Sequence, residues 1–153
     1  MCHHCDYAEL FREKGIRQTP NRLGVMEIAG SSAYPLSAQE IFDTLIRTKQ
    51  VNRVTVYRVL ELLVKKELLE RISAGDRQFR YGMAPNANHL HHPHFYCKRC
   101  NGMECLSPES IFIGTESLER TFPGSIEKVE VRIDGICRNC LRKSRSGASF
   151  RDS

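Results

Sequence analysis

Four cysteines in the second half of the chain form two matched pairs, Cys97-Lys-Arg-Cys100 and Cys137-Arg-Asn-Cys140. Each pair can present two thiolates from one tight turn, and two such turns complete a tetrahedral sulfur shell around zinc. Metal binding of this kind contributes folding free energy to a small domain with little hydrophobic core. A redox pair is the alternative, but the matched spacing favours a structural zinc ion bound by Cys97, Cys100, Cys137 and Cys140.

A histidine cluster directly precedes the first cysteine pair, in the segment His89-Leu-His91-His92-Pro93-His94. Neutral imidazole is a good ligand for zinc, iron and copper. Strand alternation places His92 and His94 on one face, where Cys105 on the neighbouring predicted strand can meet them. One thiolate with two or three imidazoles suits zinc, whereas ferrous sites favour imidazole with carboxylate. We therefore expect a second metal site at His92, His94 and Cys105, with His89 as a further ligand.

Alternatives remain open for these residues. The histidine segment can be a solvated linker end beside a buried Cys105, and His91 points to the opposite face. The N-terminal Cys2-His3-His4-Cys5 can form a further zinc or copper clamp, although chain starts are usually frayed. A zinc-ribbon thiol enzyme with Cys105 as its nucleophile is a competing function, because nearby imidazoles can lower the pKa of a thiol.

The elements that position these ligands follow from the pattern of the second half. Residues 84–90 are rich in Pro and Asn without periodicity and are expected to form a linker. The tail from Lys143 is polar and is expected to be disordered. Between them we predict strands near 94–97 and 102–106, a helix over about 109–121, and a strand over 126–133 that is rich in β-branched residues.

The first half combines helices with a hairpin. Helices are predicted over 7–14, from a second start capped by Thr19, and from a third start where Ser37 and Glu40 form a capping box. A hairpin over 68–83 follows the last helix. Helices followed by a hairpin predict a winged helix, in which the last helix enters the major groove of DNA.

The clearest helical pattern spans 53–65. Its apolar residues recur at i, i+3, i+4, i+7 and i+8 from Val56, which leaves the other face exposed. On that face Tyr57 can pack against thymine methyl groups, Arg58 can reach phosphate or guanine, and Lys65 can neutralise backbone charge. A solvated helix is the alternative. The candidate DNA-binding residues, including two arginines near the second helix, are Arg17, Arg22, Thr55, Tyr57, Arg58 and Lys65.

Composition is that of an ordinary globular protein. The 153 residues are 41% hydrophobic and 27% charged, and the net charge of +5 permits nucleic-acid binding without locating a surface for it. No stretch is long and apolar enough to span a membrane, and the start lacks the apolar core of a secretory signal, so a cytoplasmic location is expected. Seven cysteines in such a chain favour metal binding over disulfides.

Several motifs, taken in order, resemble one known family. They are Gly15-Ile-Arg17-Gln-Thr19-Pro-Asn-Arg22, Leu36-Ser37-Ala38, Thr55-Val-Tyr57-Arg58, and His-His-Pro-His with the two Cys-x-x-Cys pairs. This order resembles the ferric uptake regulator (Fur) family over about residues 8–142. The resemblance implies an α+β fold with a winged-helix DNA-binding domain over 1–83, a hinge over 84–90 and a small α/β dimerisation domain with a four-cysteine zinc ribbon over 91–142. The polar composition adds a disordered tail over 143–153.

The resemblance also implies partners and roles. Such a regulator acts as a homodimer on an A/T-rich pseudo-palindrome of double-stranded DNA, and metal binding near the hinge sets the separation of its recognition helices. The paired cysteines match the family's structural zinc site, and His92 and His94 match two ligands of its sensing site. Cys105 stands where a sensing-site glutamate usually lies. Tyr57 and Arg58 match the base- and phosphate-contacting pair.

Several departures argue against an iron or peroxide sensor. Tyr34-Pro35-Leu36 stands where those sensors carry a histidine, and Gly82 or its neighbours replace an acidic ligand at the end of the wing. Pro93 replaces the usual aspartate, and residues 127–136 contain no histidine, so an auxiliary site is lost. An iron-type set of six ligands is therefore depleted.

A tetrahedral site of His92, His94, Cys105 and His89 survives these departures, and it resembles the zinc uptake regulator (Zur) branch. We expect a metal-responsive repressor that holds a structural and a regulatory Zn²⁺ and controls zinc-uptake genes. The alternative is an iron- or peroxide-sensing regulator of the same family, for which Glu104 or Glu109 would supply an oxygen ligand.

Overall fold

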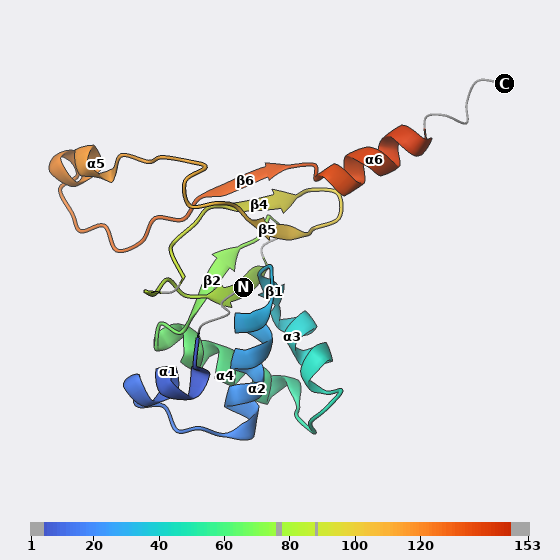
Figure 1. Cartoon of the computed structure of the whole chain (residues 1–153). Coiled ribbons are helices and arrows are strands. Elements are labelled where there is room, and N and C mark those ends of the chain that lie inside the picture. Colours follow the sequence, from blue (N-terminus) through green and yellow to red (C-terminus); the bar gives the residue numbers. More distant parts are fainter. Residues whose placement is uncertain (1–4, 76–77, 88, 148–153) are drawn as a thin grey trace. The chain divides into compact units, whose positions relative to one another are not determined.

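The structure of the protein, a computed structural model, describes residues 5–75, 78–87 and 89–147. It divides between His91 and His92 into two compact units, which we call unit 1 and unit 2, and each unit has its own sheet (Figure 1). Most of the predicted N-terminal clamp and part of the hairpin turn lie outside the described residues. Within them, no helix has the length and apolar character that crossing a membrane requires.

The helices of unit 1 begin at side chains that accept a hydrogen bond from the backbone of the first turn. Thr19 and Ser37 take this role as predicted, and Glu40 completes the capping box by accepting from the Ser37 backbone N–H. Asp6 and Asn52 cap the other two. The helices are α1 (Tyr7–Glu13), α2 (Pro20–Ser31), α3 (Ala38–Leu45) and α4 (Arg53–Lys65).

The sheet of unit 1 is antiparallel and has the order β1-β3-β2, with β1 at Leu36–Ser37, β2 at Leu69–Ser73 and β3 at Phe79–Met83. Leu69 pairs with Met83 at the base of the predicted hairpin. The helices pack on this sheet through a core of fully buried side chains that includes Phe11, Met26, Ile41, Leu60 and Leu63. The predicted fold of the N-terminal domain is confirmed.

Unit 2 is built on a three-stranded sheet of order β5-β4-β6. Strand β4 (His94–Cys97) pairs antiparallel with β5 (Met103–Cys105) and parallel with β6 (Arg132–Gly135). Helices α5 (Thr115–Thr121) and α6 (Arg138–Gly147) precede and follow β6. In the described part of unit 2 the buried side chains are few for a unit of this size, and sulfur and imidazole are prominent among them: His92, Pro93, His94, Tyr96, Cys97, Met103 and Cys140.

Two predicted elements of unit 2 are shorter in the structure. The helix expected over 109–121 spans only Thr115–Thr121, because Gly114 stands at its N-cap and the residues before it include β-branched Ile111 and Ile113, which disfavour helix. The strand expected over 126–133 covers only Arg132–Gly135. Parallel pairing there needs β4 as a partner, and β4 begins opposite Arg132.

Two further expectations need correction. The predicted disordered tail from Lys143 begins too early, because α6 continues through Lys143 to Gly147. Residues 148–153 of that tail lie outside the described residues. The expectation that the cysteines avoid disulfides fails at Cys5, which is disulfide-bonded, whereas the cysteines of unit 2 form no disulfide.

Candidate metal centres and nucleic-acid interface

The four paired cysteines meet at one end of the unit 2 sheet. Their sulfur atoms all lie within 4.8 Å of one another. Parallel pairing of β4 with β6 brings the turns together, because Cys97 lies opposite Gly135, just before Cys137. The backbone N–H of Cys137 donates to the Cys97 sulfur at 3.3 Å. The sequence prediction that Cys97, Cys100, Cys137 and Cys140 converge agrees with this geometry.

The local backbone favours the thiolate form of Cys97, which is the form that binds a cation. Backbone N–H groups, first that of Cys100 and then that of Cys137, lower the pKa of the Cys97 thiol to about 6. Burial raises the pKa of the Cys140 thiol to about 12. Asn101, at φ +59°, turns the chain after the first pair, and the Tyr96 hydroxyl donates to its side-chain oxygen at 2.9 Å. A set of four sulfur donors fits zinc.

The second cluster consists of His92, His94 and Cys105, whose ligand atoms also lie within 4.8 Å of one another. His94 pairs directly with Cys105 across the β4–β5 ladder, and the ring centroids of His92 and His94 are 4.7 Å apart. Both histidines are buried, whereas Cys105 is exposed. Two imidazoles and one thiol therefore line a site that opens to solvent at the cysteine.

The other two described histidines, His89 and His91, do not join this cluster. His91 is exposed, and His89 belongs to unit 1, where its backbone forms an isolated bridge with Asn86. Within the described ranges, no carboxylate joins either metal cluster, and that includes Glu104 and Glu109. The donor set at the second cluster thus consists of nitrogen and sulfur.

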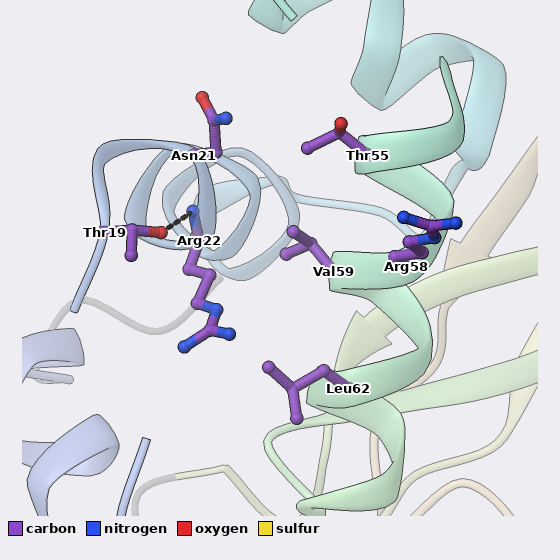
Figure 2. A pocket seen from close by; sticks show the side chains of 7 residues that line it. All are labelled: Thr19, Asn21, Arg22, Thr55, Arg58, Val59 and Leu62. Carbon is purple, nitrogen blue, oxygen red and sulfur yellow. Dashed lines mark hydrogen bonds between the residues drawn. The ribbon is translucent and has the colours of Figure 1, made fainter. Parts of the chain in front are cut away.

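The candidate nucleic-acid interface contains a hollow of about 270 Å³ between the start of α2 and the exposed face of α4. Figure 2 shows its two walls, one from α2 and the other along α4. Thr19 accepts from the Arg22 backbone N–H at 3.3 Å, and Arg22 Nη1 donates to the carbonyl of Arg17 at 2.9 Å. The lining residues are Thr19, Asn21, Arg22, Thr55, Arg58, Val59 and Leu62.

The hollow gathers some of the predicted DNA-binding residues but not all of them. Arg22, Thr55 and Arg58 line it, whereas Tyr57 and Lys65 are exposed on α4 outside it. A helix N-terminus beside two arginines is suited to an anion such as a phosphate. Asn21, Val59 and Leu62 also line the hollow, and their types and spacing did not indicate an interface. Asn21 was predictable from the sequence as a residue of this helix N-terminus, because it follows Pro20 in the first turn of α2.

Comparisons with known proteins agree with this architecture. The model of the "Ferric uptake regulator family" matches residues 13–131. The ferric uptake regulation protein of Bacillus subtilis is 31% identical over 111 residues, which cover 71% of this chain and 73% of that protein. The regulator PerR of Clostridium acetobutylicum is 24% identical and covers 91% of this chain and 99% of its own. A zinc uptake regulator complexed with zinc and DNA shares the fold at a TM-score of 0.65 and 20% identity, over 91% of this chain and 93% of that one.

Proposed function

The chain belongs to the ferric uptake regulator family, and on that premise we propose that it is a zinc-responsive repressor of zinc-uptake genes. At the level of the family, it is a metal-responsive transcriptional regulator and not an enzyme. The thiol-enzyme alternative at Cys105 is therefore set aside. The choice of zinc rests on one observation, the cluster of His92, His94 and Cys105 without a carboxylate among the described residues.

We assign two zinc ions to unit 2 in this proposal. The first is structural and is bound by the four paired cysteines, in a unit whose buried apolar side chains are few. The second is regulatory and is bound by His92, His94 and Cys105. His89, three positions before His92 in the sequence, is the proposed fourth ligand. Bound zinc supplies a fixed cationic centre that holds these side chains together.

DNA recognition is assigned to α4 and to the start of α2. Tyr57 is exposed and is proposed to pack against thymine methyl groups, while Arg58 contacts phosphate or guanine. Arg17, Arg22, Thr55 and Lys65 are assigned to the DNA backbone or to a narrow minor groove. The proposed target is an A/T-rich pseudo-palindrome, which a homodimer with two α4 helices would match.

Support for a homodimer comes from the surface of unit 2. Large apolar side chains are exposed there, and Phe112 reaches 94% exposure. An accumulation of this kind in one small unit is typical of a surface that another protein covers. In the described part of unit 2, the large apolar side chains that are exposed are Phe112, Ile113, Leu118, Phe122, Ile126, Ile133 and Leu141.

The proposed switch is an equilibrium between dimers whose two α4 helices fit one face of DNA and dimers whose helices do not. The ligand residues must hold zinc more tightly in the first form, since only differential affinity moves an equilibrium. A change from 1:99 to 99:1 needs about 5.5 kcal/mol of differential affinity. By reciprocity, operator DNA must tighten binding of the regulatory zinc by the same factor.

The test is DNA binding as a function of free metal. Protein that retains only its ribbon zinc is titrated anaerobically with Zn²⁺, Fe²⁺ or Mn²⁺ in the presence of a labelled operator duplex. We expect Zn²⁺ to restore binding at the lowest free concentration, and Cys105→Ser to abolish that response. His91→Ala is the matched control and should respond as the wild type does.

The competing assignment is an iron or peroxide sensor, as the names of the curated relatives suggest. Restoration of operator binding by Fe²⁺ at a lower free concentration than Zn²⁺ would favour that assignment over ours. A response to neither metal would contradict both.

A further inference from the structure

Helix α6 and the turn between Cys97 and Cys100 are rich in positive charge, and the DNA contacts proposed for α2 and α4 give these residues no role. We propose that this surface, which we call the basic end, binds the phosphate backbone of nucleic acid as a second contact outside α4. The basic end consists of Lys98, Arg99, Arg138, Arg142, Lys143 and Arg145. The inference rests on the proposed DNA-binding function and extends it to unit 2.

Charge in unit 2 is segregated along the chain. Residues 135–147 contain four cations and no carboxylate, and the acidic residues of the described part of unit 2 lie between Glu104 and Asp134. The ion pairs found in unit 2 join Lys128 to Glu130 and Arg132 to Asp134. Within the described residues, the cations of α6 therefore have no ion-pair partner.

The helix presents its cations in an ordered row. Arg138, Arg142 and Arg145 are spaced i, i+4 and i+7, so they share one face over about 10 Å of helix. Cys140 and Ser144 lie toward the other side, where Arg99 donates to the Cys140 carbonyl at 3.1 Å and to the Ser144 hydroxyl. The arginine row is exposed, and α6 projects from the end of the β4–β6 sheet (Figure 1).

Helix stability does not account for this row. Like charges at i and i+4 repel, and Arg138 stands in the first turn, where the helix dipole disfavours a cation. Only Lys143 and Arg145, toward the C-terminus, are placed as the dipole would favour. A ten-residue helix in which Cys140 is the one buried residue among those whose burial is described is marginal by itself in water. An external polyanion would relieve the repulsion and hold the helix.

The chemistry of the row favours phosphate diesters over other anionic surfaces. Guanidinium groups pair with phosphate in a bidentate geometry, and a row of them suits a row of phosphates. A helix that lies on a membrane needs a broad apolar face. Leu141 is the only large apolar side chain that the described part of α6 exposes. Contacts of this kind add affinity without reading sequence.

The experiment measures the salt dependence of duplex binding by zinc-loaded protein, on an operator and on an unrelated duplex of equal length. We expect Arg138→Gln/Arg142→Gln/Arg145→Gln to lower the slope of log K against log salt by about 0.9 for each lost contact, equally on both duplexes. Arg47→Gln/Lys66→Gln/Arg120→Gln removes the same charge from exposed positions elsewhere and should leave a slope close to the wild type. Lysine at all three α6 positions should retain most of the wild-type slope.

Each other outcome overturns the inference. A slope equal to that of the charge-matched control means that α6 does not contact DNA. If the triple glutamine variant loses binding to anionic phospholipid vesicles while its salt slope on DNA is unchanged, the arginine row belongs to a membrane contact. If the variant changes only in dimerisation, the row belongs to a protein partner. Ribbon zinc content and the melting temperature confirm that the variants are folded. If the wild type itself fails to bind the operator, the proposed function fails instead.

Discussion

His94 lies directly opposite Cys105 across the antiparallel ladder of β4 and β5. Directly opposed residues in such a ladder have Cβ atoms about 4.5–5.5 Å apart and point to the same face. The pairing therefore places an imidazole and a thiol together through strand register alone. His92, two residues before His94, adds a second imidazole to the same cluster.

Replacing Cys105 by serine is expected to remove one zinc per monomer and leave the other in place. Serine is close in size, but its hydroxyl is a poor zinc ligand, so the second cluster keeps only its imidazoles. Elemental analysis under reducing conditions measures the stoichiometry. The neighbouring Glu104→Gln is the control, because Glu104 pairs with Phe95 and points to the opposite face. An equal zinc content in Cys105→Ser and the wild type would exclude Cys105 as a ligand.

Replacing Cys140 by serine should remove the structural zinc, which Cys105→Ser leaves in place, and unit 2 should then lose its folded structure. Cys140 is buried, and unit 2 has few other apolar side chains to hold α6 against the sheet. Limited proteolysis should then cut after His91 while unit 1 survives as a fragment, because unit 1 has its own core. A strong chelator applied to the wild type should reproduce the same fragment. Protection of unit 2 in both cases would contradict a structural role for zinc.

The geometry of these two clusters was predictable from sequence for different reasons. The ribbon follows from the matched spacing of Cys97/Cys100 and Cys137/Cys140. The second cluster follows from two short strands near 94–97 and 102–106, which the structure confirms at His94–Cys97 and Met103–Cys105. In both, the ligand types restrict the geometry more than the surrounding residues do.

What sequence did not reveal depends on partners far along the chain. The β-branched run over 126–133 has strand character throughout, yet β6 begins only at Arg132, where the chain pairs with β4, and it continues to Gly135. A hollow is harder still to predict from sequence. Val59 is buried and Leu62 half-buried on α4, and nothing in the nearby sequence indicates that α2 leaves space beside them. Tertiary context decides such features.

Arg58→Ala is expected to weaken operator binding by about 1–3 kcal/mol if Arg58 contacts a base, and to lower the salt slope by about one unit if it contacts phosphate. Both effects follow from its position on the wall of the hollow. Fluorescence anisotropy at several salt concentrations distinguishes them, since only base contact makes the loss depend on sequence. Arg47→Ala, an exposed cation outside the hollow, is the control. An unchanged affinity would remove Arg58 from the interface.

Ser37→Ala should lower the free energy of unfolding of unit 1 by about 1 kcal/mol. The Ser37 hydroxyl accepts from the Glu40 backbone N–H at 3.1 Å, and that donor loses its partner in alanine. Chemical denaturation monitored by helical circular dichroism measures the change. Ser31→Ala, at an exposed position in α2, should cost less. Zinc content should be equal in both variants, because neither residue lies in unit 2.

Gly24→Ala tests whether helix propensity or packing decides stability in the middle of α2. Alanine at a helix interior position gains about 1 kcal/mol over glycine. A Cβ atom at Gly24 would stand only 2.7 Å from Leu45 Cδ1 and 3.2 Å from Lys49 Cε. Leu45 is 1% exposed and cannot move without disturbing the core.

Packing should decide the sign of the change in the free energy of unfolding. Overpacking of a core costs about 1–3 kcal/mol, so the net result should be a destabilisation of unit 1 by about 1 kcal/mol. The free energy of unfolding from chemical denaturation measures it. Gly24→Ala combined with Leu45→Val, which shortens the opposing side chain, should be less destabilised than the sum of the two single variants, because the two changes share one contact. A stabilised single variant would show that Leu45 yields freely, and that the close approach of α2 and α3 does not require glycine.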